Sequence, residues 1–284
     1  MEGSSCTKCL RKRHVPPRGL QQGFHITEGG EEYFYVDART PASTSRWPRS
    51  EHSVAEAAGA LANMAPLYAM NKSGLNLAYA TYNDQPPTGT DGATVDSHGH
   101  TKGVILFDEQ QGVWLVHSVP DFPGSLTADT TSSPTPAAST DKWRYVYETA
   151  VGITLGKDVL VSTWRNGRGG KLPPACNGVA GPRVLDVLQM RFDQASSNAS
   201  LAFDNTEDHS KWAVSLPGKT WTHDKAEESG GNSDVGYVHR HAHRMQSQLR
   251  RGGETLCFRN AMLHGLLLNS VVSHDTCPRN TAAA

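Results

Sequence analysis

The sequence contains no long hydrophobic run and no strong excess of charge of either sign. No stretch of its 284 residues approaches the ~18 consecutive apolar residues that a membrane-spanning helix needs. The formal net charge is −1 at pH 7, so the charge balance at neutral pH does not indicate a nucleic-acid-binding protein. Hydrophobic residues still make up 37% of the chain, which excludes a wholly disordered protein and fits one large domain or two small ones.

Cysteine is scarce, and its spacing argues against a zinc ribbon. Of the five cysteines, Cys6 and Cys9 have metal-ligand spacing, but no second Cys or His pair follows at the required distance. The alternative is that residues 1–29 form a basic, disordered leader. This leader also lacks the apolar core of a signal peptide.

Histidine is frequent by comparison. Protonation of all 13 histidines in mild acid would raise the formal net charge from −1 to +12. Such a chain would attract polyanions better in an acidic compartment than at neutral pH.

The tripeptide His-x-Lys occurs at His100/Lys102 and again at His209/Lys211. Residues two apart on a strand share one face, so each imidazole would point the same way as its lysine in an extended segment. An imidazole can act as nucleophile or proton carrier on a phosphodiester, and an ammonium can hold the phosphate oxygens. A single copy also arises by chance on a surface strand, and the repetition favours the catalytic interpretation.

Hydrophobic patterns predict several strands and one helix. A helix is expected over residues 54–67, ending before Pro66. The runs at 104–107 and 113–116 predict a hairpin with a turn at 108–112, in the interior of a sheet that is covered on both faces. Further strands are expected at 33–36, 75–82 and 157–164, and a strand or short helix at 184–192.

Residues 124–141 are rich in Ser, Thr, Pro and Ala without a packing pattern, and predict a flexible linker. Farther along, His239, His241 and His243 alternate, which leaves two hypotheses open: a metal site or a solvated polar strand.

Four segments resemble the deoxyribonuclease II family. Gly99-His-Thr-Lys-Gly-Val-Ile-Leu-Phe-Asp108, followed by Val113-Trp-Leu-Val-His-Ser-Val-Pro-Asp-Phe-Pro123, is similar to its first active-site segment. Asn205-Thr-Glu-Asp-His-Ser-Lys-Trp212 is similar to its second, and Tyr82-Asn-Asp-Gln-Pro-Pro87 to the segment that precedes the first. The resemblance extends over residues 30–123 and 143–278.

The resemblance implies an α/β fold of the phospholipase D type, in which two similar halves share one active site. The halves would be residues 30–123 and 142–278, joined by the linker 124–141 and followed by a tail at 279–284. The family's long middle region would be missing, so neighbouring strands are expected to expose apolar faces and open edges.

The resemblance also implies a mechanism without metal or cofactor. One of His100 and His209 would attack phosphorus and form a phosphohistidine, and the other would protonate the leaving oxygen and then activate water. Lys102 and Lys211 would stabilise the equatorial oxygens. The substrate would be DNA, cut in acid to leave 3′-phosphates, and the location would be lysosomal or secreted.

Further residues follow from the same resemblance. A disulfide between Cys176 and Cys277 is implied, which leaves Cys257 odd. Asp208 would either orient an imidazole or cap a turn. The residues near the bound phosphate would be His117, Ser118, Arg244, Gln248 and Arg251. For each of them, the alternative is a solvated position on the surface.

Two other function classes remain open at this stage. One is a catalytically inactive, truncated family member, and the other is a polyanion-binding protein without turnover. No oligomeric state is predicted.

Overall fold

The computed structural model describes a large part of the chain but not all of it. The described residues are 5–7, 21–22, 33–37, 39–53, 56, 58, 62, 64–67, 76–83, 102–116, 147–163, 165, 170–176, 181–208, 210–222, 225–228, 236–240 and 255–278.

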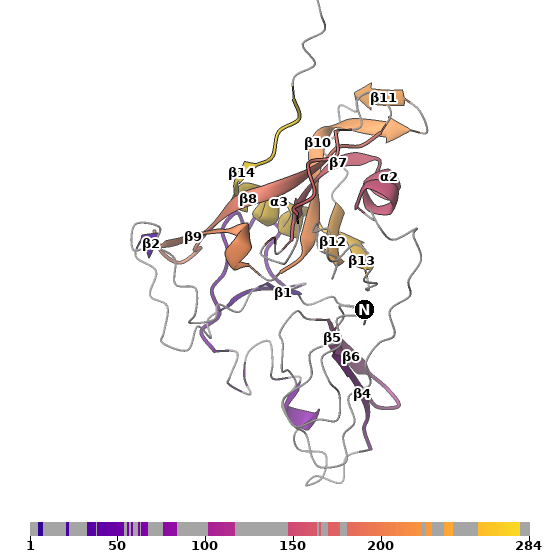
Figure 1. The fold of residues 1–284 in the computed structure, drawn as a ribbon. Helices are drawn as coiled ribbons and strands as arrows, with labels where there is room; N and C mark the ends of the chain where they lie inside the picture. Colours follow the sequence, from indigo (N-terminus) through magenta and orange to yellow (C-terminus); the bar gives the residue numbers. More distant parts are fainter. Residues whose placement is uncertain are drawn as a thin grey trace, which may run out of the picture.

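The described part is a mixed α/β structure with two main sheets (Figure 1). The strands are β1 (Ser5–Thr7), β2 (Gln21–Gln22), β3 (Phe34–Val36), β4 (Ala78–Asn83), β5 (Lys102–Phe107), β6 (Gly112–Val116), β7 (Lys157–Ser162), β8 (Val184–Asp193), β9 (Ser200–Asp204), β10 (Trp212–Thr222), β11 (Lys225–Glu228), β12 (Gly236–Arg240), β13 (Thr255–Arg259) and β14 (Val271–His274). The helices are η5 (Tyr147–Val151), α2 (Gly152–Leu155), η6 (Asn205–Glu207) and α3 (Ala261–Ser270).

The larger sheet has nine strands and carries the second His-x-Lys segment. Its order is β13-β12-β10-β7-β8-β9-β2, with β11 added to β10 and β14 to β8. β7 pairs parallel with β8 and antiparallel with β10. β7 is buried along its whole length, with Leu160 in one hydrophobic cluster and Val159 and Val161 in another. Three consecutive buried apolar side chains, two of them β-branched, suit such a central strand.

Helices cover both faces of this sheet. On one face, α3 contributes Leu263, Leu266 and Leu267 to the main core. The α3 helix begins at Asn260, whose side chain accepts a hydrogen bond from the Leu263 N–H and so caps the helix. On the other face, Tyr147 and Val151 pack against β7.

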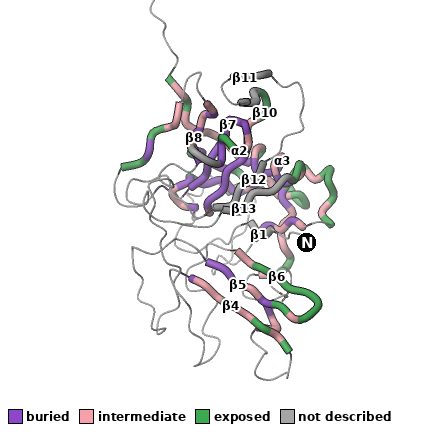
Figure 2. The backbone as a smooth tube through the Cα atoms, turned by 90° about the vertical axis from the view of Figure 1, so that its right-hand side faces the viewer, coloured by how far each residue is buried: buried purple, intermediate pink, exposed green. Residues whose placement is uncertain are grey.

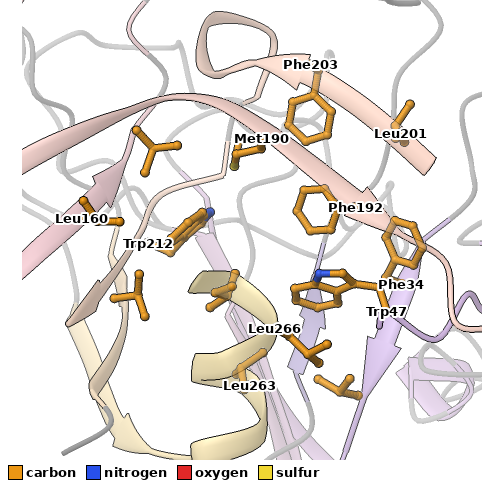
Figure 3. Packing of buried hydrophobic residues seen from close by; sticks show 14 of the residues in the cluster. Phe34, Trp47, Leu160, Met190, Phe192, Leu201, Phe203, Trp212, Leu263 and Leu266 are labelled. Carbon is orange, nitrogen blue, oxygen red and sulfur yellow. The ribbon is translucent and has the colours of Figure 1, made fainter. Parts of the chain in front are cut away.

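The main core joins segments that are far apart in the sequence. Trp47 lies between Phe192 on β8 and α3, and its Nε1–H donates to the Ser270 hydroxyl at 2.7 Å (Figure 3). Phe34 stacks on Phe192, which stacks on Phe203. Residues 33–50, which the sequence assigns to the first half, are therefore packed on the sheet of the second half.

The smaller sheet has the order β4-β5-β6 and contains the predicted hairpin. One face is a hydrophobic cluster in which Val104 and Leu106 pack against Met64 and Leu67. Figures 1 and 2 show this sheet set apart from the larger one.

The opposite face of the smaller sheet is open, which corrects the expectation of cover on both faces. Trp114 is 53% exposed and Phe107 46% exposed. The Tyr82 ring lies across Gly103, and the Trp114 Nε1–H donates to its hydroxyl at 3.0 Å. A Cβ at residue 103 would lie 2.2 Å from the Tyr82 hydroxyl oxygen, so this close approach requires glycine.

Two local predictions were wrong. Residues 65–67 are helical, so the predicted helix does not end before Pro66. Proline is accepted in the first turn of a helix, where its missing N–H has no helical partner. In the predicted leader, Ser5–Thr7 pairs with β3 and Gln21–Gln22 with β9, so disorder does not extend over these two segments.

A disulfide joins Cys176 to Cys277, the pair that the resemblance implies. Beside it, the buried Arg165 guanidinium lies 3.4 Å from Asp275 and 3.7 Å from Asp186, and donates to the Leu172 carbonyl. Among the residues that the structure describes, no helix combines the length and hydropathy that crossing a bilayer would require.

Candidate active site

Lys102 is the first residue of β5, the central strand of the smaller sheet. Its side chain lies on the same face as Val104 and Leu106 because side chains alternate along a strand. It is 0% exposed, and the residue opposite it on β4 is Asn83, which is also buried. Lys102 and Asn83 each have interaction partners, as a buried ammonium and a buried amide require.

Lys211 occupies a similar position in the larger sheet. It directly precedes β10, which lies between β12 and β7 inside that sheet. Its side chain is also 0% exposed and has interaction partners. In both sheets, the lysine of the motif is therefore buried at the point where a central strand begins.

A tightly bonded turn leads into Lys211. Asp204 and Glu207 form a capping box around η6. The Asn205 side-chain amide donates to the Val187 carbonyl on β8, which ties the turn to the sheet. Both carboxylate oxygens of Asp208 accept hydrogen bonds from Ser210. The bonds from Ser210 fit the role of Asp208 in capping the turn, and because residue 209 lies outside the described part, its role in orienting an imidazole stays a prediction.

Several predicted site residues lie outside the described part. The two lysines belong to different sheets, so the convergence of both motifs on one phosphate stays a prediction. The predicted site residues outside the described part are His100, His209, His117, Ser118, Arg244, Gln248 and Arg251.

Sequence reasoning assigned no role to Asn83 and Asn205. Both lie in segments that carry the family resemblance, and both are buried. The sequence signal that could have identified them is the presence of each asparagine in a segment that resembles the family. The position of Asn83 opposite Lys102 is known only from the pairing of β4 with β5.

A metal site is not visible in the described part of the chain. No cluster of three or more His, Cys, Asp or Glu side chains suited to a metal ion occurs there. Of the three alternating histidines, His239 lies on β12, while His241 and His243 are outside the description. The choice between a metal site and a solvated strand at these histidines stays open.

The turn of the β5–β6 hairpin is held by Asp108. Its Oδ1 accepts hydrogen bonds from the Gln110 and Gln111 backbone N–H groups, both at 2.8 Å. These bonds, first that from Gln110, hold the pKa of the Asp108 carboxyl below its ordinary value. The stabilisation of the folded state by these bonds is fully present above the unfolded pKa of aspartate, about 3.9. It is lost as the pH falls through the lower pKa of Asp108 in the folded protein. The hairpin that begins with Lys102 therefore keeps its turn in mild acid.

We expect Asp108→Ala to lower the melting temperature equally at pH 7 and at about pH 5, and the difference from wild type to disappear as the pH falls through the lowered folded pKa of Asp108. Thermal melts across this range measure the effect, with the exposed neighbour Glu109→Ala as control. If the loss of melting temperature in Asp108→Ala grew between pH 7 and about pH 5, this would contradict the role of the Asp108 carboxylate in holding the turn.

Comparison with known proteins gives a consistent result over most of the chain. A model of the family described as Deoxyribonuclease II matches residues 17–145 and 135–277. Deoxyribonuclease-2-alpha of Sus scrofa is 26% identical, with 91% of this chain and 85% of the relative aligned. The same protein of Mus musculus is 28% identical, with coverage of 83% and 81%. Plancitoxin-1 of Acanthaster planci is 26% identical, with coverage of 96% and 93%. Since the family model matches well over half of its residues, this chain belongs to the deoxyribonuclease II family.

Proposed function

We propose that the chain is a metal-independent acid endonuclease that hydrolyses DNA phosphodiesters. The observation that carries the proposal is the pair of fully buried lysines, Lys102 and Lys211, each in a His-x-Lys motif and each at the start of a central strand. Lysine is almost never fully buried unless it has partners, so a second such lysine at the equivalent motif position supports a functional pair.

Burial alone does not identify these two lysines. Lys157 is also buried, but its ammonium donates to the Gly218 carbonyl and belongs to no His-x-Lys motif. Lys102 and Lys211 differ from it in their sequence context, because each belongs to a His-x-Lys motif.

The proposed architecture is that of the phospholipase D type, with two halves that share one site and a shortened centre. The family match is in two parts that overlap at residues 135–145, a range that begins inside the predicted linker 124–141. The open aromatic face of the β4-β5-β6 sheet supports the loss of a covering region.

The proposed chemistry has two steps. One imidazole of His100 and His209 attacks phosphorus, the P–O5′ bond breaks, and the other imidazolium gives its proton to the leaving 5′ oxygen. That second imidazole then takes a proton from water as the water attacks the phosphohistidine, which leaves a 3′-phosphate. The two ammonium groups stabilise the negative charge on the equatorial oxygens, so no metal ion is required.

The proposed binding residues would surround this phosphate. His117 and Ser118 follow β6, while Arg244, Gln248 and Arg251 lie between β12 and β13. Guanidinium groups suit this role because they bind phosphate oxygens bidentately. The proposed setting is lysosomal or secreted, where acid charges the histidines and favours DNA binding.

The decisive experiment is a plasmid-nicking assay at pH ~5 with excess chelator present, on wild type, His100→Ala and His209→Ala. The proposal expects cutting by wild type that resists chelator and that each substitution abolishes, with 3′-phosphate ends. DNA binding without cutting would instead indicate a polyanion-binding protein. A soluble, folded wild type that neither cuts nor binds would indicate an inactive family member.

A further inference from the structure

The turn before Lys211 is ordered by side chains that have no assigned part in the reaction. The segment from Asp204 to Ser210 contains three bonded units: the capping box at its start, the Asn205 amide bond to β8, and the bonds from Ser210 to Asp208. The Asn205 bond fixes where the turn lies against the sheet, and the Asp208 bonds fix how the turn ends.

Asp208 is the unit closest to the motif. Its Oδ1 accepts from the Ser210 backbone N–H at 3.0 Å, and its Oδ2 accepts from the Ser210 hydroxyl at 2.5 Å. Asp208 is buried, so its carboxylate depends on partners within the protein, which include the two Ser210 donors. The two bonds join the residues on either side of position 209 in the chain.

We infer that Asp208 is a positioning residue that fixes the backbone on both sides of residue 209 and so sets the direction in which the chain enters Lys211 and β10. The inference rests on the proposed function, because it assigns Asp208 to the catalysis of the second His-x-Lys motif. A charge-assisted bond to a backbone N–H in a buried position is short and directional, as preorganisation of a reacting group requires. Asp208 itself does not touch the phosphate.

The test compares Asp208→Ala with Asp208→Asn in the full chain. Displacement of a catalytic group by about 1 Å costs on the order of 100-fold in rate, so we expect Asp208→Ala to lower kcat roughly 30- to 100-fold with KM within about twofold of wild type. Asp208→Asn keeps an oxygen that can accept from the Ser210 N–H, and we expect it to recover most of the lost kcat. A change in KM alone, or no recovery with asparagine, would overturn the assignment.

Asp204→Ala is the matched control, because it removes another carboxylate from the same segment without affecting the Asp208–Ser210 bonds. It should lower kcat by no more than about threefold. If Asp204→Ala and Asp208→Ala lose activity equally and in proportion to their melting temperatures, then Asp208 serves stability only.

Hydrogen exchange separates this inference from the proposed function. The Ser210 and Lys211 amides should exchange faster in Asp208→Ala than in wild type and Asp204→Ala, whether or not the protein cuts DNA. Unchanged exchange overturns the positioning role by itself. A wild type that does not cut overturns the proposed function, and then faster exchange in Asp208→Ala retains only the structural half of the inference.

Discussion

Replacing Lys102 or Lys211 by methionine is expected to lower kcat by about 100- to 1000-fold, as loss of one preorganised group that stabilises transition-state charge does in other enzymes. Methionine has a similar length and fills the space of the buried side chain, so the fold should persist. Because the ammonium would act mainly on charge that develops in the transition state, KM should change much less than kcat. Single-turnover cleavage of a short duplex measures both.

Lys157→Met provides the matched control for these two variants. Lys157 is a buried lysine at the start of β7, with its ammonium on the Gly218 carbonyl. Its replacement removes the same charge from a comparable environment, and we expect a lower melting temperature with unchanged kcat. A loss of kcat in Lys157→Met as large as in Lys102→Met would mean that buried lysines here support the fold and not the chemistry.

Removing the disulfide with Cys176→Ser and Cys277→Ser is expected to lower the free energy of unfolding by about 3–5 kcal/mol. The two cysteines are 101 positions apart, so the bond closes a long loop and restricts the unfolded chain strongly. Urea unfolding with and without reductant measures the effect.

Reductant is the internal control for the disulfide. It should destabilise wild type by an amount similar to the double substitution and should leave the doubly substituted chain unchanged. A wild type that is insensitive to reductant after full reduction, confirmed by thiol counting, would contradict the prediction. The Arg165 cluster beside Cys277 would then be what holds the C-terminal segment.

Some strands of the fold were predictable, because their signals are local, whereas β9, β13, β14 and the helix α3 were not predicted. The hairpin of β5 and β6 follows from two apolar runs around a polar turn, and β7 follows from its β-branched and apolar residues. For β8, the apolar pattern left both a strand and a short helix open, and the structure has a strand. Cover of the hairpin was not predictable in this way. A continuous apolar run shows that a strand can be buried on both faces, but not that the chain supplies a second layer.

The site could be predicted only in part, because its supporting residues depend on long-range contacts. Lys102 and Lys211 were identified from the motif, and both are buried. The position of Asn83 opposite Lys102 depends on the pairing of β4 with β5, and the bond from Asn205 depends on the path of β8. Neither relationship can be read from the spacing of residues along the chain.

The position of Trp47 in the main core has a consequence for the order of events during synthesis. Its neighbours Phe192 and Ser270 leave the ribosome long after Trp47 itself, since the Trp47–Ser270 bond spans 223 positions. The Trp47 side chain therefore cannot reach its buried position until α3 has been synthesised. Contacts of this range slow folding and prolong the exposure of apolar surface, so we expect newly made copies of this protein to be prone to aggregation until α3 has been synthesised.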